Sequence, residues 1–233
     1  SPFRLLPFFG RVTRKGNRLF VHVFDWPEDR RIALPGLGEK PTSAHMMEQP
    51  EMGIPFSVEQ RNGADHLVLT LPEKPTDPVA SVVVLEFEAT PQVGPHVLRV
   101  GAGGVIDLPA SLSEIQAKHG QRAKPASKAG RVFIGNWSNP NDVVVWNFKA
   151  SADAAYRVVI DGRPASPEAD GQKIQVAIGE QKLVGAIGKD GARLDGQLKV
   201  TLGDQTLSVS LPGAKRTGPP LFDLFGVRLM PEK

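Results

Sequence analysis

The chain has 233 residues, of which 40% are hydrophobic and 23% charged, a composition typical of a globular protein with one large domain or two ordinary ones. It contains no cysteine, which excludes a disulfide framework, a thiolate zinc site and a thiol nucleophile. No apolar run approaches the roughly 18 residues of a membrane-spanning helix, so no membrane partner is predicted. The 24 glycines and 21 prolines favour short strands joined by tight turns, and the predicted fold class is therefore all-β.

The net charge of +3 is small, and basic residues gather in one stretch. This stretch comprises Lys118, His119, Arg122, Lys124, Lys128 and Arg131. Nucleic-acid sites usually combine basic residues with aromatic rings that stack on bases, and no aromatic residue is interleaved here. We therefore expect a solvated loop and no nucleic-acid partner.

Residues 1–92 predict a small antiparallel β-sandwich of five or six strands, because runs of alternating or continuous apolar residues are bounded by turn residues. Its clearest strands, in chain order, are Arg18–Phe24, Phe56–Gln60, His66–Leu71 and Ser81–Phe87. Asn62-Gly63 supplies the positive-φ residues of a hairpin turn between the second and third of these. Pro91 to Gly104 is rich in glycine and proline, which predicts a linker at 93–104.

Residues 105–233 predict a second β-domain with the strand spacing of a sandwich or jelly roll. Its predicted strands are Val105–Leu108, Val143–Phe148, Tyr156–Ile160, Lys173–Ile178, Gln181–Ile187, Gln197–Leu202, Gln205–Leu211 and Phe225–Met230. Gly179-Glu180, Gly203-Asp204 and Asp161-Gly162 are the predicted turns. Ser111–Lys118 predicts a helical turn, with Ser111 and Glu114 as a capping box.

No catalytic constellation is recognisable in the sequence. There is no G-x-S-x-G nucleophile motif, and the five histidines lack the spacing of metal ligands. We therefore predict no catalytic residue, no metal site and no cofactor.

A polar loop around Trp137 is the candidate carbohydrate-binding site. A sugar site needs an apolar face for the C–H side of the ring and polar groups for its hydroxyls. Trp137 could supply the face, and Asn136, Asn139 and Asp142 the polar groups. The alternative is that Trp137 folds back as a plug over the end of the sandwich, and its exposure distinguishes the two.

Several short sequence motifs in the first domain resemble the segment that follows the catalytic barrel in bacterial α-L-fucosidases, the family 29 glycoside hydrolases. These motifs are Ser1–Phe3, Leu6–Thr13, Lys15–Pro27, Leu34–Leu37, Leu71-Pro72, Asp77-Pro78 and Ser81–Glu86. The resemblance covers about residues 1–90 and implies an antiparallel β-sandwich that packs against the barrel. The chain also begins without methionine, and we expect it to be part of a longer protein.

The second domain is similar to the galactose-binding-like, carbohydrate-binding jelly roll that some of these enzymes carry. The similar motifs are Val105–Leu108, Ile134–Pro140, Val145–Phe148, Tyr156–Val158 and Val227–Pro231. Related modules often hold structural calcium, for which Glu114 and Asp223 are the conceivable ligands, although no loop is dense in ligands.

The resemblance implies an α-L-fucosidase as the parent protein and carbohydrate metabolism as its role. In that family the Asp nucleophile and the acid/base lie on or beside the barrel, upstream of Ser1, so this chain is predicted to be inactive alone. Its implied partners are that catalytic barrel and a glycan carrying fucose, in a periplasmic or extracellular location. Phe3, Phe8, Phe9 and Trp26 are the residues expected to face the barrel.

Two other functions stay open. Both domains could be spacers and stabilisers without a ligand. The chain could instead be an unrelated hydrolase, which would need two carboxylates roughly 5–9.5 Å apart in a concave site.

Overall fold

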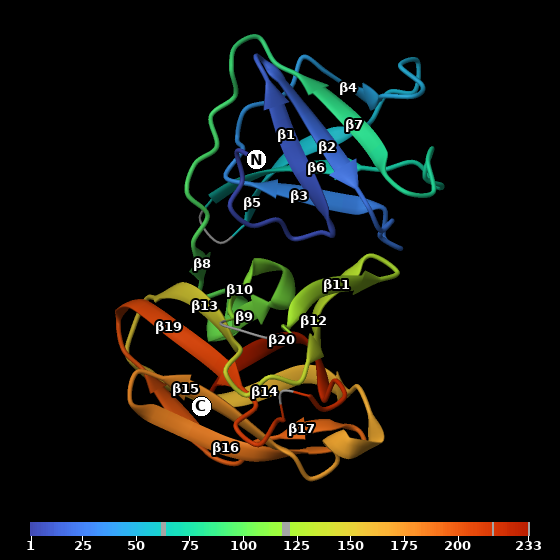
Figure 1. The fold of residues 1–233 in the computed structure, drawn as a ribbon. Helices are drawn as coiled ribbons and strands as arrows, with labels where there is room; N and C mark the ends of the chain where they lie inside the picture. The colour runs from blue at the N-terminus through green and yellow to red at the C-terminus, as the bar shows by residue number, and fades with distance from the viewer. Residues whose placement is uncertain (62–63, 118–121, 216, 233) are drawn as a thin grey trace. The chain divides into compact units, whose positions relative to one another are not determined.

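Figure 1 shows the computed structural model of the chain, which describes residues 1–61, 64–117, 122–215 and 217–232. The predicted all-β fold class is confirmed. Contacts divide the chain into two compact units, Ser1–His96 with Ser127–Val132, and Val97–Ala126 with Phe133–Lys233. The domain limits at 92 and 105 stay a prediction. No helix in the described ranges is long and apolar enough to cross a membrane.

The first unit contains two antiparallel sheets. One has the strand order β1-β2-β7-β4 and the other the order β3-β6-β5. The strands are β1 (Gly10–Lys15), β2 (Arg18–Val23), β3 (Arg31–Pro35), β4 (Ser43–Met46), β5 (Phe56–Arg61), β6 (Ala64–Thr70) and β7 (Ser81–Glu86). Strands β2, β5, β6 and β7 match the predicted runs, whereas β1, β3 and β4 were not predicted. Asn62-Gly63, the predicted turn, lies outside the described residues.

Alternating burial builds the core of this unit. Leu19, Val21 and Val23 of β2 point inward while the residues between them are more exposed, as a half-buried strand requires. In β7 the first five residues are all buried, and the strand lies between β2 and β4. The continuous apolar run therefore marks a central strand of the sheet.

The four aromatic residues expected to face the barrel do not form one exposed patch. Phe3 and Phe8 are buried in the core, 7% and 6% exposed. Phe9 packs edge-on against Phe24, with ring centroids 6.1 Å apart. Trp26 is partly buried and its Nε1 donates a hydrogen bond to the Pro72 carbonyl at 3.0 Å. Phe3 and Phe8 pack into the core of the unit itself, so the prediction of an exposed patch made by all four residues is wrong.

Two backbone segments of the first unit meet at Gly36. The amide of Gly36 donates to Asp65 O at 2.9 Å, and Gly36 O accepts from the amide of Gly94 at 2.8 Å. Gly36 has φ +76°, and a Cβ atom there would overlap the Gly94 carbonyl oxygen. Only glycine meets both demands without strain.

The second unit also contains two main sheets, although Ser127–Val132, within the second of them, group with the first unit. The strands of the first sheet are β8 (Leu98–Arg99), β10 (Glu114–Gln116), β13 (Val143–Ala150), β15 (Lys173–Ile178), β16 (Gln181–Gly188), β17 (Gly191–Arg193) and β19 (Gly203–Ser210). The strands of the second sheet are β9 (Ile106–Pro109), β11 (Lys124–Lys128), β12 (Arg131–Trp137), β14 (Ala154–Pro164), β18 (Gln197–Val200) and β20 (Phe222–Pro231). Short 3-10 turns are η1 (Ala102–Gly104), η2 (Ala110–Leu112) and η3 (Pro167–Ala169).

Large side chains from both sheets fill the second unit. Trp146 and Phe148 of β13 and Phe222 of β20 are at most 1% exposed. The Trp146 indole N–H donates to Pro109 O at 2.8 Å, so its one polar group is satisfied inside the core.

The predicted helical turn at Ser111–Lys118 is wrong. The 3-10 turn η2 starts after Pro109, no side chain caps it, and the strand β10 follows. Glu114 pairs with Val145 in the β13 ladder, so strand pairing overrides the local capping pattern. Lys118 lies outside the described residues.

Two predicted turns are also wrong. Strand β14 continues through Asp161-Gly162, where a bulge shifts the register against β20. Gly203-Asp204 begins β19 instead of preceding it. Gly179, by contrast, adopts φ +57° in the turn between β15 and β16.

The basic stretch is only in part a loop. Lys124 and Lys128 lie in β11 and Arg131 in β12, while Arg122 precedes them. Lys118 and His119 lie outside the described residues.

Candidate functional site

Trp137, the centre of the predicted sugar site, is fully buried. It ends β12, pairs with Phe222 of β20 and is 0% exposed. Its indole N–H is buried and has no hydrogen-bond partner among the described residues. Trp137 therefore presents no open face in this structure, and of the two alternatives its burial favours the one in which it folds back over the end of the sandwich.

The polar neighbours of Trp137 hold the surrounding backbone. The Asn136 amide group donates to Arg122 O at 3.0 Å, and Asn139 Oδ1 accepts from the Asn141 amide at 3.1 Å. Asp142 is 0% exposed, and its Oδ2 accepts from the Ala123 amide at 2.7 Å. These three side chains thus stabilise the loop, and sugar binding at it stays a prediction that would require the loop to open.

The two conceivable calcium ligands belong to different sheets. Glu114 lies in β10, whereas Asp223 lies in β20 and forms an ion pair with Arg163. Among the residues that the structure describes, no three potential ligands gather as a metal site.

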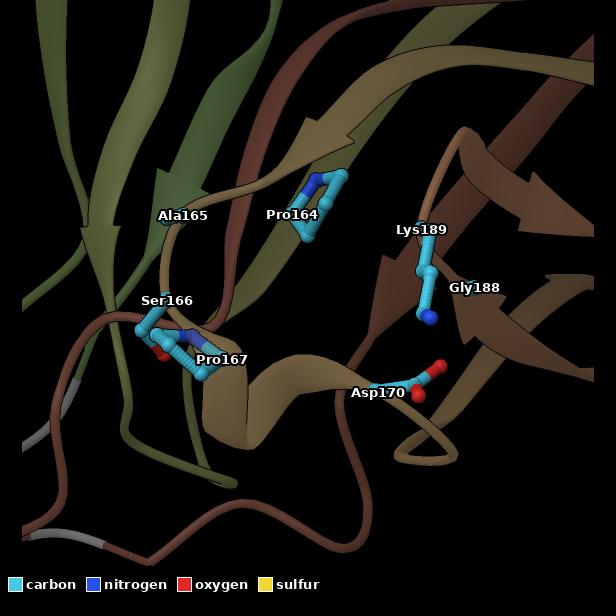
Figure 2. A pocket seen from close by; sticks show the side chains of 7 residues that line it. All are labelled: Pro164, Ala165, Ser166, Pro167, Asp170, Gly188 and Lys189. Carbon is cyan, nitrogen blue, oxygen red and sulfur yellow. The ribbon is translucent and has the colours of Figure 1, made fainter.

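A hollow of about 520 Å³ opens on the second unit where strand β14 ends (Figure 2). Pro164 closes β14, and Pro167 begins η3, a position where the missing proline N–H costs no hydrogen bond. The opposite wall is Gly188-Lys189 at the end of β16. Its volume falls within the roughly 300–1,000 Å³ typical of ligand pockets.

The walls of the hollow combine apolar and polar groups of both hydrogen-bonding types. Figure 2 shows the Asp170 carboxylate and the Lys189 ammonium on the same side of the hollow, directed toward each other. The rings of Pro164 and Pro167 supply apolar surface, and Ser166 Oγ is buried without a partner among the described residues. The lysine and the carboxylate offer a donor and an acceptor to a neutral polar ligand.

Backbone hydrogen bonds fix the shape of this hollow. The amide of Gly171 donates to Ile187 O, and the amide of Ile187 donates to Gln172 O, at 2.8 and 2.9 Å. On the other side the amide of Ala165 donates to Leu221 O at 3.0 Å. The hollow is therefore preformed. A second hollow of about 520 Å³ adjoins it, shares Asp170 and Lys189, and adds Asp190 and Arg193.

The first unit holds an unusual pair of histidines. His66 of β6 is 3% exposed, and its ring meets that of His96 edge-on at 5.0 Å. Both ring nitrogens of His96 are buried without a partner among the described residues. The pKa of His96 lies below its ordinary value of 6.5, because burial disfavours the charged ring and because positive charge on His66 repels it.

This histidine pair predicts that acid destabilises the first unit. Well above pH 6.5 His96 is neutral in both folded and unfolded chains, so it adds no pH dependence there. Below pH 6.5 the unfolded chain gains a proton that the folded chain resists, and stability falls with pH. Thermal unfolding of His96→Gln should show a weaker loss between pH 7 and pH 5 than the wild type. His22→Gln is the control, and equal losses in all three proteins would contradict the prediction.

Comparison with known proteins gives remote structural likenesses. No protein-family model and no curated protein matches the chain. It is similar to an α-L-fucosidase from Vibrio sp. strain EJY3, with 15% identity and a TM-score of 0.49 over 100% of this chain and 40% of that chain. It is also similar to a GH26-CBM35 β-(1,4)-mannanase from Podospora anserina, with 13% identity and a TM-score of 0.43 over 56% and 28% of the two chains.

The likeness extends beyond glycoside hydrolases. The mosquito-larvicidal Cry4Aa toxin from Bacillus thuringiensis is similar at 9% identity and a TM-score of 0.46, over 92% of this chain and 30% of that chain. The chain thus spans less than half of each of these three proteins. At these identities and TM-scores the likeness does not assign an activity.

Sequence reasoning missed the hollow of Figure 2. It marked Asp161-Gly162 as the start of a loop, whereas the hollow is made by residues 164–170 and by Gly188-Lys189. The Pro164–Gly171 segment, with two prolines and a terminal Asp-Gly, was the available signal of a shaped loop.

Proposed function

We propose that this chain is a non-catalytic region of an α-L-fucosidase-like glycoside hydrolase. Its first unit braces the catalytic barrel, and its second unit binds glycan in the hollow of Figure 2. The sequence motifs of the first unit support this family, and the all-β fold suits accessory β-domains. The preformed hollow is the observation that carries the glycan-binding part.

The chemistry of the hollow favours binding over hydrolysis. Glycoside hydrolysis generally uses two carboxyl groups that flank the scissile bond. Among the described residues that line the hollow of Figure 2, Asp170 alone bears a carboxylate, and a lysine faces it. A carboxylate accepts from a sugar hydroxyl and an ammonium donates to one, so the pair suits a neutral sugar.

This function predicts that charge removal in the hollow weakens sugar binding. Asp170→Asn and Lys189→Met should each weaken binding of methyl α-L-fucoside or a fucosylated oligosaccharide by about tenfold, the effect of one hydrogen bond to a charged group. Lys182→Met, at an exposed site of β16, the strand that precedes Lys189, is the matched control. Calorimetric titration measures the change. Absence of binding by the wild type, or equal binding by all four proteins, would contradict the proposal.

A purely structural role is the second candidate. The complete burial of Trp137 favours a structural role for its loop, because the side chain predicted to stack on a sugar belongs to the core. Failure of every tested glycan to bind the folded chain would favour this role for the whole second unit.

A further inference from the structure

A compact polar and aromatic cluster lies on the second sheet of the second unit. It comprises Phe133 of β12, Arg163 of β14, and Asp223 and Phe225 of β20, and is called the Arg163 cluster below. The two phenyl rings are 5.4 Å apart and tilted by 47°. The Arg163 guanidinium lies 5.9 Å from the Phe133 centroid and 5.6 Å from that of Phe225.

Strand register brings these residues to one face. Arg163 pairs directly with Asp223, and Ile134 pairs with Leu224, which places Phe133 beside Phe225. Phe222 and Leu224 of β20 are 0% exposed and point into the core. Since side chains alternate along a strand, Asp223 and Phe225 point the other way, and both are only partly buried.

Gly135 keeps space open inside this cluster. A Cβ atom there would lie 2.8 Å from Phe133 Cε2 and 3.2 Å from Asp223 Oδ1. Gly135 has no left-handed backbone conformation that would by itself call for glycine. Glycine inside a strand often marks a place where another group approaches closely. Here its small size lets the Asp223 carboxylate lie against the sheet.

The ion pair leaves hydrogen-bonding groups of both kinds at the surface. Nε of Arg163 donates a hydrogen bond to Asp223 Oδ2 at 3.1 Å, and Nη2 lies 3.1 Å from the same oxygen as an ion-pair contact. Oδ1 of Asp223 accepts no hydrogen bond from the described residues in this structure. The Arg163 side chain is 50% and that of Asp223 15% exposed. A guanidinium N–H donor and a carboxylate acceptor thus stand side by side, next to aromatic rings.

We propose that the Arg163 cluster binds one neutral pyranose through two adjacent hydroxyls. One hydroxyl donates to Asp223 Oδ1, the neighbouring hydroxyl accepts from Arg163, and the C–H side of the ring lies against the phenyl groups. An anionic ligand fits less well, because Asp223 already neutralises Arg163 and would repel it. The sugar class rests on the proposed function, whereas the diol chemistry rests on the cluster alone.

Amide NMR signals of the full chain test this site. The probes are methyl β-D-galactoside, methyl α-L-fucoside, cis-cyclohexanediol with adjacent hydroxyls, and cyclohexanol as the one-hydroxyl control. Saturable shifts should appear at the amides of Gly135, Asp223 and Phe225 with the two glycosides and with cis-cyclohexanediol. The shifts with cyclohexanol should be much smaller. Arg163→Lys and Asp223→Asn should weaken binding about tenfold or more, because each loses a charge-assisted bond.

The matched control is Arg228→Lys. Arg228 of β20 also forms an exposed ion pair, in which its Nε lies 3.0 Å from Asp107 Oδ1. This control variant should leave binding unchanged, and thermal melting confirms that each variant folds. No diol-dependent shift at the three amides, or equal binding by Arg163→Lys, overturns the inference. Glycoside shifts confined to Ser166 and Lys189 also overturn it while the proposed function stands. Binding of the cyclohexanediol at the cluster, with no glycoside bound anywhere, supports the diol chemistry alone and contradicts both the pyranose assignment and the proposed function.

Discussion

Replacing Trp137 by alanine is expected to destabilise the second unit by about 3–5 kcal/mol, the usual cost of emptying a large core position. The ring is 0% exposed, and its strand pairs with Phe222, which is equally buried. The backbone there is also used, because Trp137 O accepts from the Leu221 amide at 2.9 Å. Since domains are generally stable by only about 5–15 kcal/mol, this loss is a large share of the total.

Guanidinium unfolding followed by the fluorescence of Trp146 measures this effect. Leu202→Ala is the control, because Leu202 is 65% exposed and its removal should change stability by no more than about 0.5 kcal/mol. A Trp137→Ala protein of unchanged stability that no longer binds a sugar would contradict the core role and restore the sugar-platform prediction.

Gly36→Ala should destabilise the first unit by about 2–5 kcal/mol. A left-handed backbone costs a residue other than glycine roughly 1–2 kcal/mol, and forcing a methyl group into a filled space adds roughly 1–3 kcal/mol. Both terms apply, because Gly36 has φ +76° and its added Cβ would overlap Gly94 O. The hydrogen bond between Gly94 and Gly36 would be strained at the same time.

Gly16→Ala separates the two terms. Gly16 has φ +60°, but nothing lies within 4 Å of an added Cβ atom, so only the backbone cost of about 1–2 kcal/mol remains. Urea unfolding followed by Trp26, the single tryptophan of the first unit, compares the variants. Equal losses at both positions would show that the close approach of Gly94 contributes nothing.

The strands that could be predicted carry their signal locally. The alternating residues of β2 and the apolar run of β7 are recognisable within six residues. Strand β1 has one buried residue, Val12, and its pairing with β2 supplies the rest. Gly162 looked like a turn residue, but it lies in a bulged strand where a Cβ atom would overlap the Phe222 ring. Only the tertiary neighbour explains that glycine.

The candidate site was harder to predict than the fold. Trp137 in a polar stretch has the same local pattern whether it is exposed or buried, and packing against β20 decides. Asp170 and Lys189 are 19 positions apart, and the antiparallel pairing of β15 with β16 brings them to one hollow. The Arg163 cluster joins three strands by register, which no local pattern contains.

The most direct test of the glycan-binding account is an NMR titration of the full chain with a fucosylated oligosaccharide. The account predicts saturable amide shifts at Ser166, Asp170 and Lys189, with no release of fucose during the experiment. Unchanged spectra at saturating sugar, or fucose released by the purified chain, would contradict it.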